Sequence, residues 1–449
     1  MKDLIYNIFS NRSARTTLLV KNIIFSTAVK GWAAVVALIM VPLTLNCLGT
    51  YKNGVWLTIS SLLLWIDQMD IGLGNGLRNR LATYIARNDT EAARKIISST
   101  MAMLACIMIP ILLILTAIIW WGDVFSMLNV SPAIIPELRV SLLCAVVLVC
   151  MTFVMKSIGN VYMGMQLPAV SNMMIALGQT LAMVATWLLY HYHEATFLNI
   201  VVVNTAAPLI IYLAAYPYTF YKKFFHLRPS IRFVNLRAAL ELGNIGVKFF
   251  WLQLAGMIQF MTANILISRF FTPEMVTPYQ ITYRYMSLVM VVFTIICMPF
   301  WNATTDAYER GDIQWISNAS KKMSLTTTAI GLFMIVMVIG APYVYRIWIG
   351  DSCQIPKGMT VLMALYIYLM MLSMRYSYFL NGIGALRIQL YMTVMTVLFI
   401  PMAWFVSKET HDIRWLMGVM CFCILPSITA NKIQFHKILK GKAVGLWRI

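Results

Sequence analysis

Two lysines lie inside apolar segments that are long enough to cross a bilayer, where a fixed positive charge can bind an anion. Lys30 belongs to NIIFSTAVKGWAAVVALIMVPLTLN (22–46), and Lys248 belongs to NIGVKFFWLQLAGMIQFMTAN (244–264). A shift of 218 positions pairs Lys30 with Lys248, Thr44 with Thr262, and Asn46 with Asn264. A charge inside a span costs about 3 kcal/mol on insertion scales. A cation repeated in two halves therefore predicts an anion site on the axis between them.

Polar side chains share helix faces with these lysines, at steps close to multiples of 3.6 residues. Arg284 and Arg375 also fall within apolar segments. Lys30 is about 12 Å into its span at 1.5 Å per residue. The other three cations are nearer an interface, where they either bind substrate or extend to lipid headgroups. The predicted substrate-binding residues are Lys30, Lys248, Arg284, Arg375, Asn244, Gln259, Thr44 and Thr262.

Two acidic residues lie near the inner end of the second apolar segment. Asp67 and Asp70 are spaced i, i+3 and share a helix face, so they could pair with Lys30 or take part in ion coupling. They could equally be a solvated helix end. We expect no metal site, no cofactor and no catalytic residues, although coupling to a proton or sodium gradient would supply energy for transport.

The composition places the chain in a membrane. Hydrophobic residues make up 60%, charged residues only 11%, and the mean hydropathy is +0.77, so we predict an all-α, polytopic membrane protein. Apolar runs of about 20 residues, the length of one crossing, predict twelve spans. They lie near 22–46, 52–72, 97–121, 138–158, 168–190, 196–219, 244–268, 279–301, 323–348, 358–381, 388–407 and 413–431.

Lysine and arginine positions predict the orientation. With the N-terminus inside, the cytoplasmic segments carry 24 of the 35 basic residues and the outer segments carry 7. The positive-inside rule then places both termini in the cytoplasm. The net charge of +19 favours attraction to anionic lipids of the inner leaflet over nucleic-acid binding.

One basic connection divides the chain into two halves of six spans. We predict an N-terminal lobe at 1–220, a cytoplasmic linker helix at 221–243 along the membrane surface, and a C-terminal lobe with a basic tail at 244–449. An even number of spans per half gives both repeats the same topology, related by an axis along the membrane normal.

Two further matches support the repeat. NRLATYIARND from Asn79 and NATTDAYERGD from Asn302 agree at three positions with a shift of 223, and Gly164 matches Gly382 at a shift of 218. Both loops hold a cation two residues before an anion. Opposite-sign pairs between the loops could form and break during transport. The predicted cytoplasmic gate residues are Arg87, Asp89, Arg310 and Asp312.

The string DIGLGNGLRNRLATYIARNDTEAARKI, from Asp70 to Ile96, resembles the segment after the second span of Wzx-type polysaccharide-biosynthesis flippases. Their multidrug/oligosaccharidyl-lipid/polysaccharide (MOP) exporter superfamily also holds the MATE exporters and the lipid II flippases. The resemblance implies a V-shaped pair of six-helix lobes with a central cationic cavity, in a bacterial inner membrane. It also implies a lipid-linked oligosaccharide substrate, and other glycan-assembly membrane proteins are expected partners.

Three function classes follow. The leading one is a flippase for an undecaprenyl-pyrophosphate-linked oligosaccharide, the repeat unit of an O-antigen, capsule or exopolysaccharide. The second is a MATE-like exporter of small molecules or drugs, which an acidic cavity would favour. The third is a membrane glycan polymerase or transferase. Such enzymes usually need a sizeable outer loop with acid–base groups, and the short outer connections here argue against catalysis.

Overall fold

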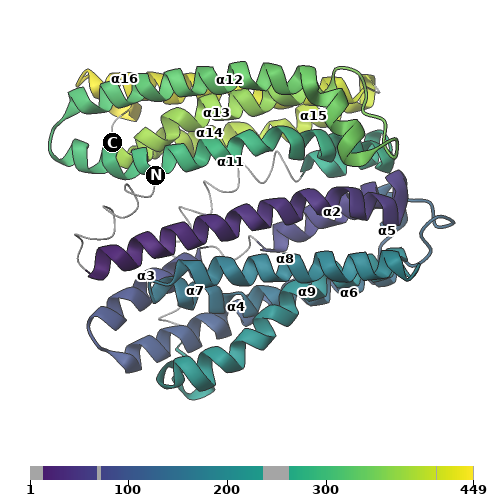
Figure 1. Ribbon diagram of the computed structural model, residues 1–449, viewed down its shortest axis with the longest axis horizontal. Coiled ribbons are helices and arrows are strands. Elements are labelled where there is room, and N and C mark those ends of the chain that lie inside the picture. The colour runs from purple at the N-terminus through teal and green to yellow at the C-terminus, as the bar shows by residue number, and fades with distance from the viewer. Residues whose placement is uncertain (1–13, 68–71, 236–261, 411, 448–449) are drawn as a thin grey trace. The chain divides into compact units, whose positions relative to one another are not determined.

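The computed structural model describes residues 14–67, 72–235, 262–410 and 412–447, which are mainly helical and include no β-strand (Figure 1). Nine helices within these ranges are long and apolar enough to cross a membrane. The prediction of an all-α, multi-pass membrane protein is confirmed.

The helices form two compact units. Unit 1 comprises residues 1–48, 63–125 and 131–249, and unit 2 comprises 49–62, 126–130 and 250–449. Two short segments of the N-terminal half, 49–62 and 126–130, therefore pack with unit 2. Several polar side chains of unit 2 are buried against these two segments.

The helices of unit 1 pack against one another mainly in pairs, some of which are not consecutive in the sequence. The main contacts join α8 with α9, α6 with α9, α4 with α6, and α3 with both α4 and α7. Asp89 and Thr196 cap the N-termini of α4 and α9 through their side chains. The elements are α3 (Leu73–Ala86), α4 (Thr90–Trp121), α5 (Val124–Leu128, which straddles both units), α6 (Leu138–Met155), α7 (Ser157–Gly164), α8 (Pro168–His191) and α9 (Phe197–Pro217).

Unit 2 has α13 at its centre, in contact with α11, α12 and α16 (Figure 1). Asp312 and Asp412 cap α12 and α16. Glycines in the left-handed region, Gly358 and Gly384, bound α13 at its two ends. The elements are α11 (Pro273–Glu309), α12 (Ile313–Ile349), α13 (Met359–Ile383), α14 (Arg387–Val397), α15 (Phe399–Thr410), α16 (Ile413–Leu439) and the 3-10 turn η4 (Gly445–Trp447).

Helix α2 (Ala14–Asp67) contains the first expected span, 22–46, and the described part of the second, 52–67. It has 54 residues and is broken at Gly49, where φ is 68° and ψ is 175°. This region of backbone space is open essentially to glycine alone. The break separates residues that belong to unit 1 from residues 49–62, which belong to unit 2.

The expected twelve spans fit the described helices once these interruptions are considered. α2 supplies two spans, and the expected span at 388–407 is divided between α14 and α15, each too short to cross alone. Most of the expected span at 244–268 lies outside the described residues. Each of the remaining expected spans corresponds to one long helix.

The linker prediction was wrong for the part of it that the structure describes. Instead of one helix, residues after α9 form a π-helical turn, η1 (Tyr218–Lys223), and two 3-10 turns, η2 (Phe225–Leu227) and η3 (Ile231–Phe233). Pro229 lies between the last two turns, and it restrains the preceding residue to extended conformations. The linker from 236 onward lies outside the described residues.

Candidate functional site

The predicted cations that the structure describes lie in three helices. Lys30 is on α2 in unit 1, and its side chain is exposed. Arg284 on α11 and Arg375 on α13 are half-buried in unit 2. Lys248, Asn244, Gln259 and Asp70 lie outside the described residues, so the paired-lysine site stays a prediction.

Arg375 has the most defined surroundings of these cations. Its Nη1 donates to Ser324 Oγ of α12 at 2.9 Å, and its Nη2 donates to the hydroxyl of Tyr376 at 2.6 Å. The guanidinium carbon lies 4.5 Å from the centre of the Tyr376 ring. Nε is buried and has no partner among the described residues. The guanidinium is thus held in a fixed orientation, and its Nε–H group has no described hydrogen-bond acceptor.

Thr44 and Thr262, which were expected to face the substrate, differ in their surroundings. Thr44 is buried, and its hydroxyl donates to the carbonyl of Met40 one turn earlier at 2.8 Å. Thr262 is half-buried at the start of the described helical residues 262–270. Hydroxyls bonded within their own helix need no partner elsewhere. Thr44 therefore offers a substrate little free donor capacity in this geometry.

A buried polar network in unit 2 lies next to Thr262. Gln280 Nε2 donates to Asn264 Oδ1 at 2.8 Å, and Asn264 Nδ2 donates to the carbonyl of Leu57 at 3.4 Å. Asn53 Nδ2 donates to Thr277 Oγ1 at 3.2 Å. These bonds satisfy polar groups in an apolar interior. They also attach segment 49–62 to α11 and to the residues preceding it.

Sequence reasoning missed a second polar cluster, between α13 and α16. Ser373 and Ser427 hydroxyls lie 3.1 Å apart, and Asn431 Nδ2 donates to Ser377 Oγ at 3.2 Å. Gln434 is fully buried, and neither of its side-chain polar atoms has a partner among the described residues. Ser373 and Ser377 are spaced i, i+4 in α13, and Ser427 and Asn431 are spaced i, i+4 in α16. Polar residues at this spacing in otherwise apolar helices were the signal that could have revealed this cluster.

The acidic residues proposed for coupling are only partly described. Asp67 is the last described residue of α2. Its pairing with Lys30 stays a prediction. No cluster of three or more His, Cys, Asp or Glu suited to a metal occurs in the part of the chain that the structure describes.

The two predicted gate loops have the same backbone geometry. Asn88 and Gly311 both have positive φ, 56° and 73°. The next residue donates to a carbonyl five positions earlier in both loops, from Asp89 to Tyr84 at 2.9 Å and from Asp312 to Ala307 at 2.8 Å. This is the Schellman ending of a helix. It shows that the matched sequences form equivalent turns.

The four gate side chains have local partners of different kinds. The carboxylates of Asp89 and Asp312 accept from the backbone N–H three residues later, both at 2.9 Å. Arg310 forms an exposed ion pair with Asp306 at 2.9 Å. Arg87 is exposed and has no ion pair within the described ranges. Both acids therefore start helices, and their expected role in a gate stays a prediction.

Solved structures with this arrangement of helices are transporters. An inward-facing multidrug resistance MATE family transporter of the MOP superfamily aligns with a TM-score of 0.74 at 16% identity, over 92% of this chain and 96% of that one. An outward-facing MATE transporter aligns with a TM-score of 0.64 at 15% identity, over 95% and 96%. No protein-family model and no curated protein matches the sequence.

A third solved structure differs in its reported binding pocket. It is a MOP superfamily transporter from Pyrococcus furiosus, for which a reversed polarity of the binding pocket suggests a different function. It aligns with a TM-score of 0.61 at 15% identity, over 95% of this chain and 96% of that one. At such identities the likeness concerns the fold. The chain is therefore a multi-pass membrane protein with the fold of MATE transporters of the MOP superfamily.

Proposed function

We propose that this protein is a flippase that moves an undecaprenyl-pyrophosphate-linked oligosaccharide from the cytoplasmic to the periplasmic leaflet by alternating access. The observation that carries the proposal is the sign of the charges within the spans. Lys30, Arg284 and Arg375 lie within α2, α11 and α13, outside the first and last turns of these helices. Within the nine described candidate spans, acidic residues occur only in the first or last turn of a helix: Glu91, Glu274, Asp306 and Glu309.

The sign of these charges separates the two transporter classes. A pyrophosphate headgroup carries negative charge through hydrocarbon, so its path needs fixed cations and hydrogen-bond donors. A path for organic cations needs carboxylates instead. Arg375 supports the first class because its guanidinium is already oriented by Ser324 and Tyr376 and keeps Nε without a partner among the described residues.

The rest of the proposal concerns the cellular setting. We place the protein in a bacterial inner membrane with both termini in the cytoplasm, next to anionic inner-leaflet lipids and other glycan-assembly membrane proteins. A proton or sodium gradient would drive the return of the empty carrier. Lys30 and Lys248 would contribute to the same anion site from the two halves.

Complementation tests this function directly. The gene is expressed in a strain that lacks its own flippase and accumulates a lipid-linked glycan, and the lipid-linked intermediates are identified by mass spectrometry. We expect the intermediate to be cleared and surface glycan to return. If cells instead gain resistance to cationic drugs and the intermediate persists, the protein is an exporter of the MATE kind.

Arg375→Gln provides the residue-level test in the same strain. The neutral amide keeps hydrogen-bonding groups but loses the charge, so we expect flipping to fall by about tenfold or more, as for loss of a charge-assisted phosphate contact. The matched control is Arg387→Gln, an exposed arginine at the start of α14. Equal activity of the two variants at equal protein levels would contradict a substrate contact at Arg375.

A further inference from the structure

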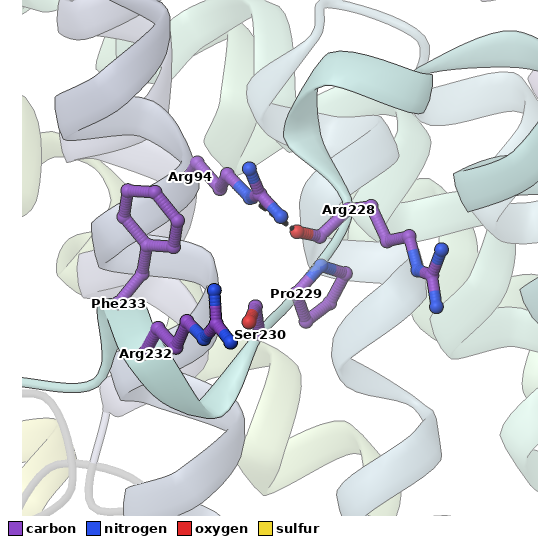
Figure 2. Close-up of a pocket in the computed structure, with 6 residues that line it drawn as sticks. All are labelled: Arg94, Arg228, Pro229, Ser230, Arg232 and Phe233. Carbon is purple, nitrogen blue, oxygen red and sulfur yellow. Dashed lines mark hydrogen bonds between the residues drawn. The ribbon is translucent and has the colours of Figure 1, made fainter.

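A cluster of basic side chains surrounds a cavity in unit 1, and none of its lining residues is one that we assign to substrate binding or to the gate. The cavity has a volume of about 350 Å³ and opens between the first turns of α4 and the residues that follow η2 (Figure 2). We call it the arginine pocket; its lining residues are Arg94, Arg228, Pro229, Ser230, Arg232 and Phe233.

Hydrogen bonds from α4 hold the wall of the arginine pocket in place. Arg94 Nε donates to the carbonyl of Arg228 at 2.7 Å. Ser98 Oγ accepts from the backbone N–H of Ser230 at 3.0 Å, and Ser99 Oγ accepts from that of Asn235 at 2.8 Å. Both serines are buried. The pocket is therefore a fixed part of unit 1.

The charge of the arginine pocket is not neutralised within the described parts of the chain. None of its three arginines forms an ion pair with a described carboxylate. The guanidinium of Arg94 lies 4.3 Å from the centre of the Phe233 ring, and that of Arg228 lies 4.2 Å from the centre of the Tyr221 ring. Stacking orients each guanidinium without consuming its N–H groups.

The side chains are arranged to receive an anion. Figure 2 shows Arg94, Arg232 and Phe233 grouped on one side of the pocket, with the Ser230 hydroxyl beside them and Arg228 extending to the other side. Guanidinium forks match the oxygen geometry of phosphate and bind it through paired N–H donors. A phosphate group suits this combination of planar cations and one hydroxyl.

Apolar side chains next to the pocket indicate where the phosphate comes from. Ile231, between two lining residues, is 91% exposed, and Phe225 in η2 is 65% exposed. Exposure of such side chains to water is unfavourable by about 25 cal/mol per Å². The same groups fit the boundary between headgroups and acyl chains. The basic residues Lys222 and Lys223 of η1 add attraction to an anionic surface.

We propose that the arginine pocket is a binding site for the headgroup phosphate of an anionic phospholipid. Arg94, Arg232 and Ser230 hold the phosphate, while Ile231 and Phe225 lie against the acyl chains. The pocket follows α9, the last described helix of the N-terminal half, so the bound lipid fixes the start of the connection between the halves to one leaflet. The inference does not depend on the transported substrate.

Lipid titration of the purified full-length protein tests the site. The probes are phosphatidylglycerol, phosphatidylcholine and inorganic phosphate, added to protein in neutral detergent, with bound lipid counted by native mass spectrometry and the shift in Tm recorded. The variants are Arg232→Gln and Arg228→Gln, because Arg94 also holds the pocket wall. The control is Arg80→Gln, an exposed arginine of α3 outside the pocket.

We expect phosphatidylglycerol to bind and raise the Tm of the wild type, with phosphatidylcholine and inorganic phosphate at least about tenfold weaker. Arg232→Gln should weaken phosphatidylglycerol binding by about tenfold, as for loss of one charge-assisted contact, and Arg228→Gln by less. Arg80→Gln should bind like the wild type. Unchanged affinity in Arg232→Gln would overturn the site, and inorganic phosphate binding as tightly as the lipid would overturn its assignment to a lipid.

Discussion

Two glycines at equivalent positions let helices approach closely, because a Cβ atom at either position would crowd the neighbouring helix. A Cβ atom on Gly382 would lie 2.9 Å from the carbonyl oxygen of Trp301 in α11. A Cβ atom on Gly164 would lie 3.1 Å from the carbonyl oxygen of Arg78 in α3. Arg78 and Trp301 are themselves related by the 223-residue shift. The same contact therefore occurs in both halves, although so few identities carried little weight in the sequence.

Gly382→Ala should destabilise the protein through this contact. The added methyl group would collide with backbone that cannot move freely, and overpacking of this kind costs about 1–3 kcal/mol. We expect a lower Tm in detergent. Gly418→Ala in α16 is the matched control, since nothing lies within 4 Å of its Cβ position. A Tm for Gly382→Ala equal to that of the control would show that α11 and α13 separate easily.

Lys30 is the deepest of the cations in its span and is exposed on the surface of unit 1. Lys30→Ala should abolish flipping at normal protein levels if the ammonium binds phosphate, and Lys30→Arg should retain part of the activity because the charge remains. The measurement is the surface glycan restored in the flippase-deficient strain. Lys321→Ala, at an exposed position on α12, is the control. Normal transport by Lys30→Ala would mean that the ammonium group of Lys30 extends to lipid headgroups and does not bind the substrate.

At the scale of the element, α2 shows how one residue can divide a continuous apolar stretch. The residues before and after Gly49 are helical, yet they pack in different units. Asn53 and Leu57, after the break, bond to Thr277 and Asn264 of unit 2. The conformation of Gly49 thus marks the break between the two helical parts of α2.

Gly49→Ala should test that conformation without any steric contact. Nothing lies within 4 Å of the Cβ position of Gly49, so the cost comes only from its φ of 68°, and such backbone strain amounts to about 1–3 kcal/mol. We expect a lower Tm and slower flipping. Gly31→Ala, also in α2 with open space around it, should instead be neutral or slightly stabilising. Equal behaviour of the two variants would argue against a required break at Gly49.

At the scale of the whole molecule, the two halves repeat a helix, a Schellman turn and a second helix on the predicted cytoplasmic side. The repeat is not perfect. Asp306 pairs with Arg310 in the second half, whereas Thr83 occupies the equivalent position in the first. Exposed ion pairs contribute only about 0–1 kcal/mol. An exchange of Arg310 between Asp306 and a partner on the other loop would therefore be nearly neutral in energy.

Crosslinking should report whether these loops approach each other during transport. Cysteines at Ala86 and Glu309, the exposed last residues of α3 and α11, avoid the left-handed positions Asn88 and Gly311. With the exposed Cys106 replaced by alanine, we expect disulfide formation that depends on substrate or on the ion gradient. The control pairs Ala86→Cys with Asp351→Cys in the α12–α13 loop and should not crosslink. Constant or absent crosslinking of the first pair would contradict this gate.

The sequence alone determined the membrane class, the helical content and most helix positions. The reason is local: a bilayer requires about 20 apolar residues for each crossing, and this requirement can be read directly from the chain. The spacing of Asn79–Asp89 and Asn302–Asp312 likewise predicted equivalent loops, because capping aspartates and turn residues act over a few positions. The prediction of a linker helix was wrong for the described residues up to 235. There Pro229 interrupts the helical pattern, and the backbone N–H groups of Ser230 and Asn235 donate to the side chains of Ser98 and Ser99 instead of to helical carbonyls.

Only the tertiary structure decided which polar side chains form hydrogen bonds within the protein and which keep unused hydrogen-bond donors. Thr44 donates to its own helix, whereas Arg375 is held by Ser324 from a helix about fifty positions away and keeps Nε without a described partner. The arginine pocket likewise joins Arg94 to residues more than 130 positions later. Partners so distant in sequence meet through packing between helices, and a hydropathy pattern, which reports each segment separately, carries no information on that packing.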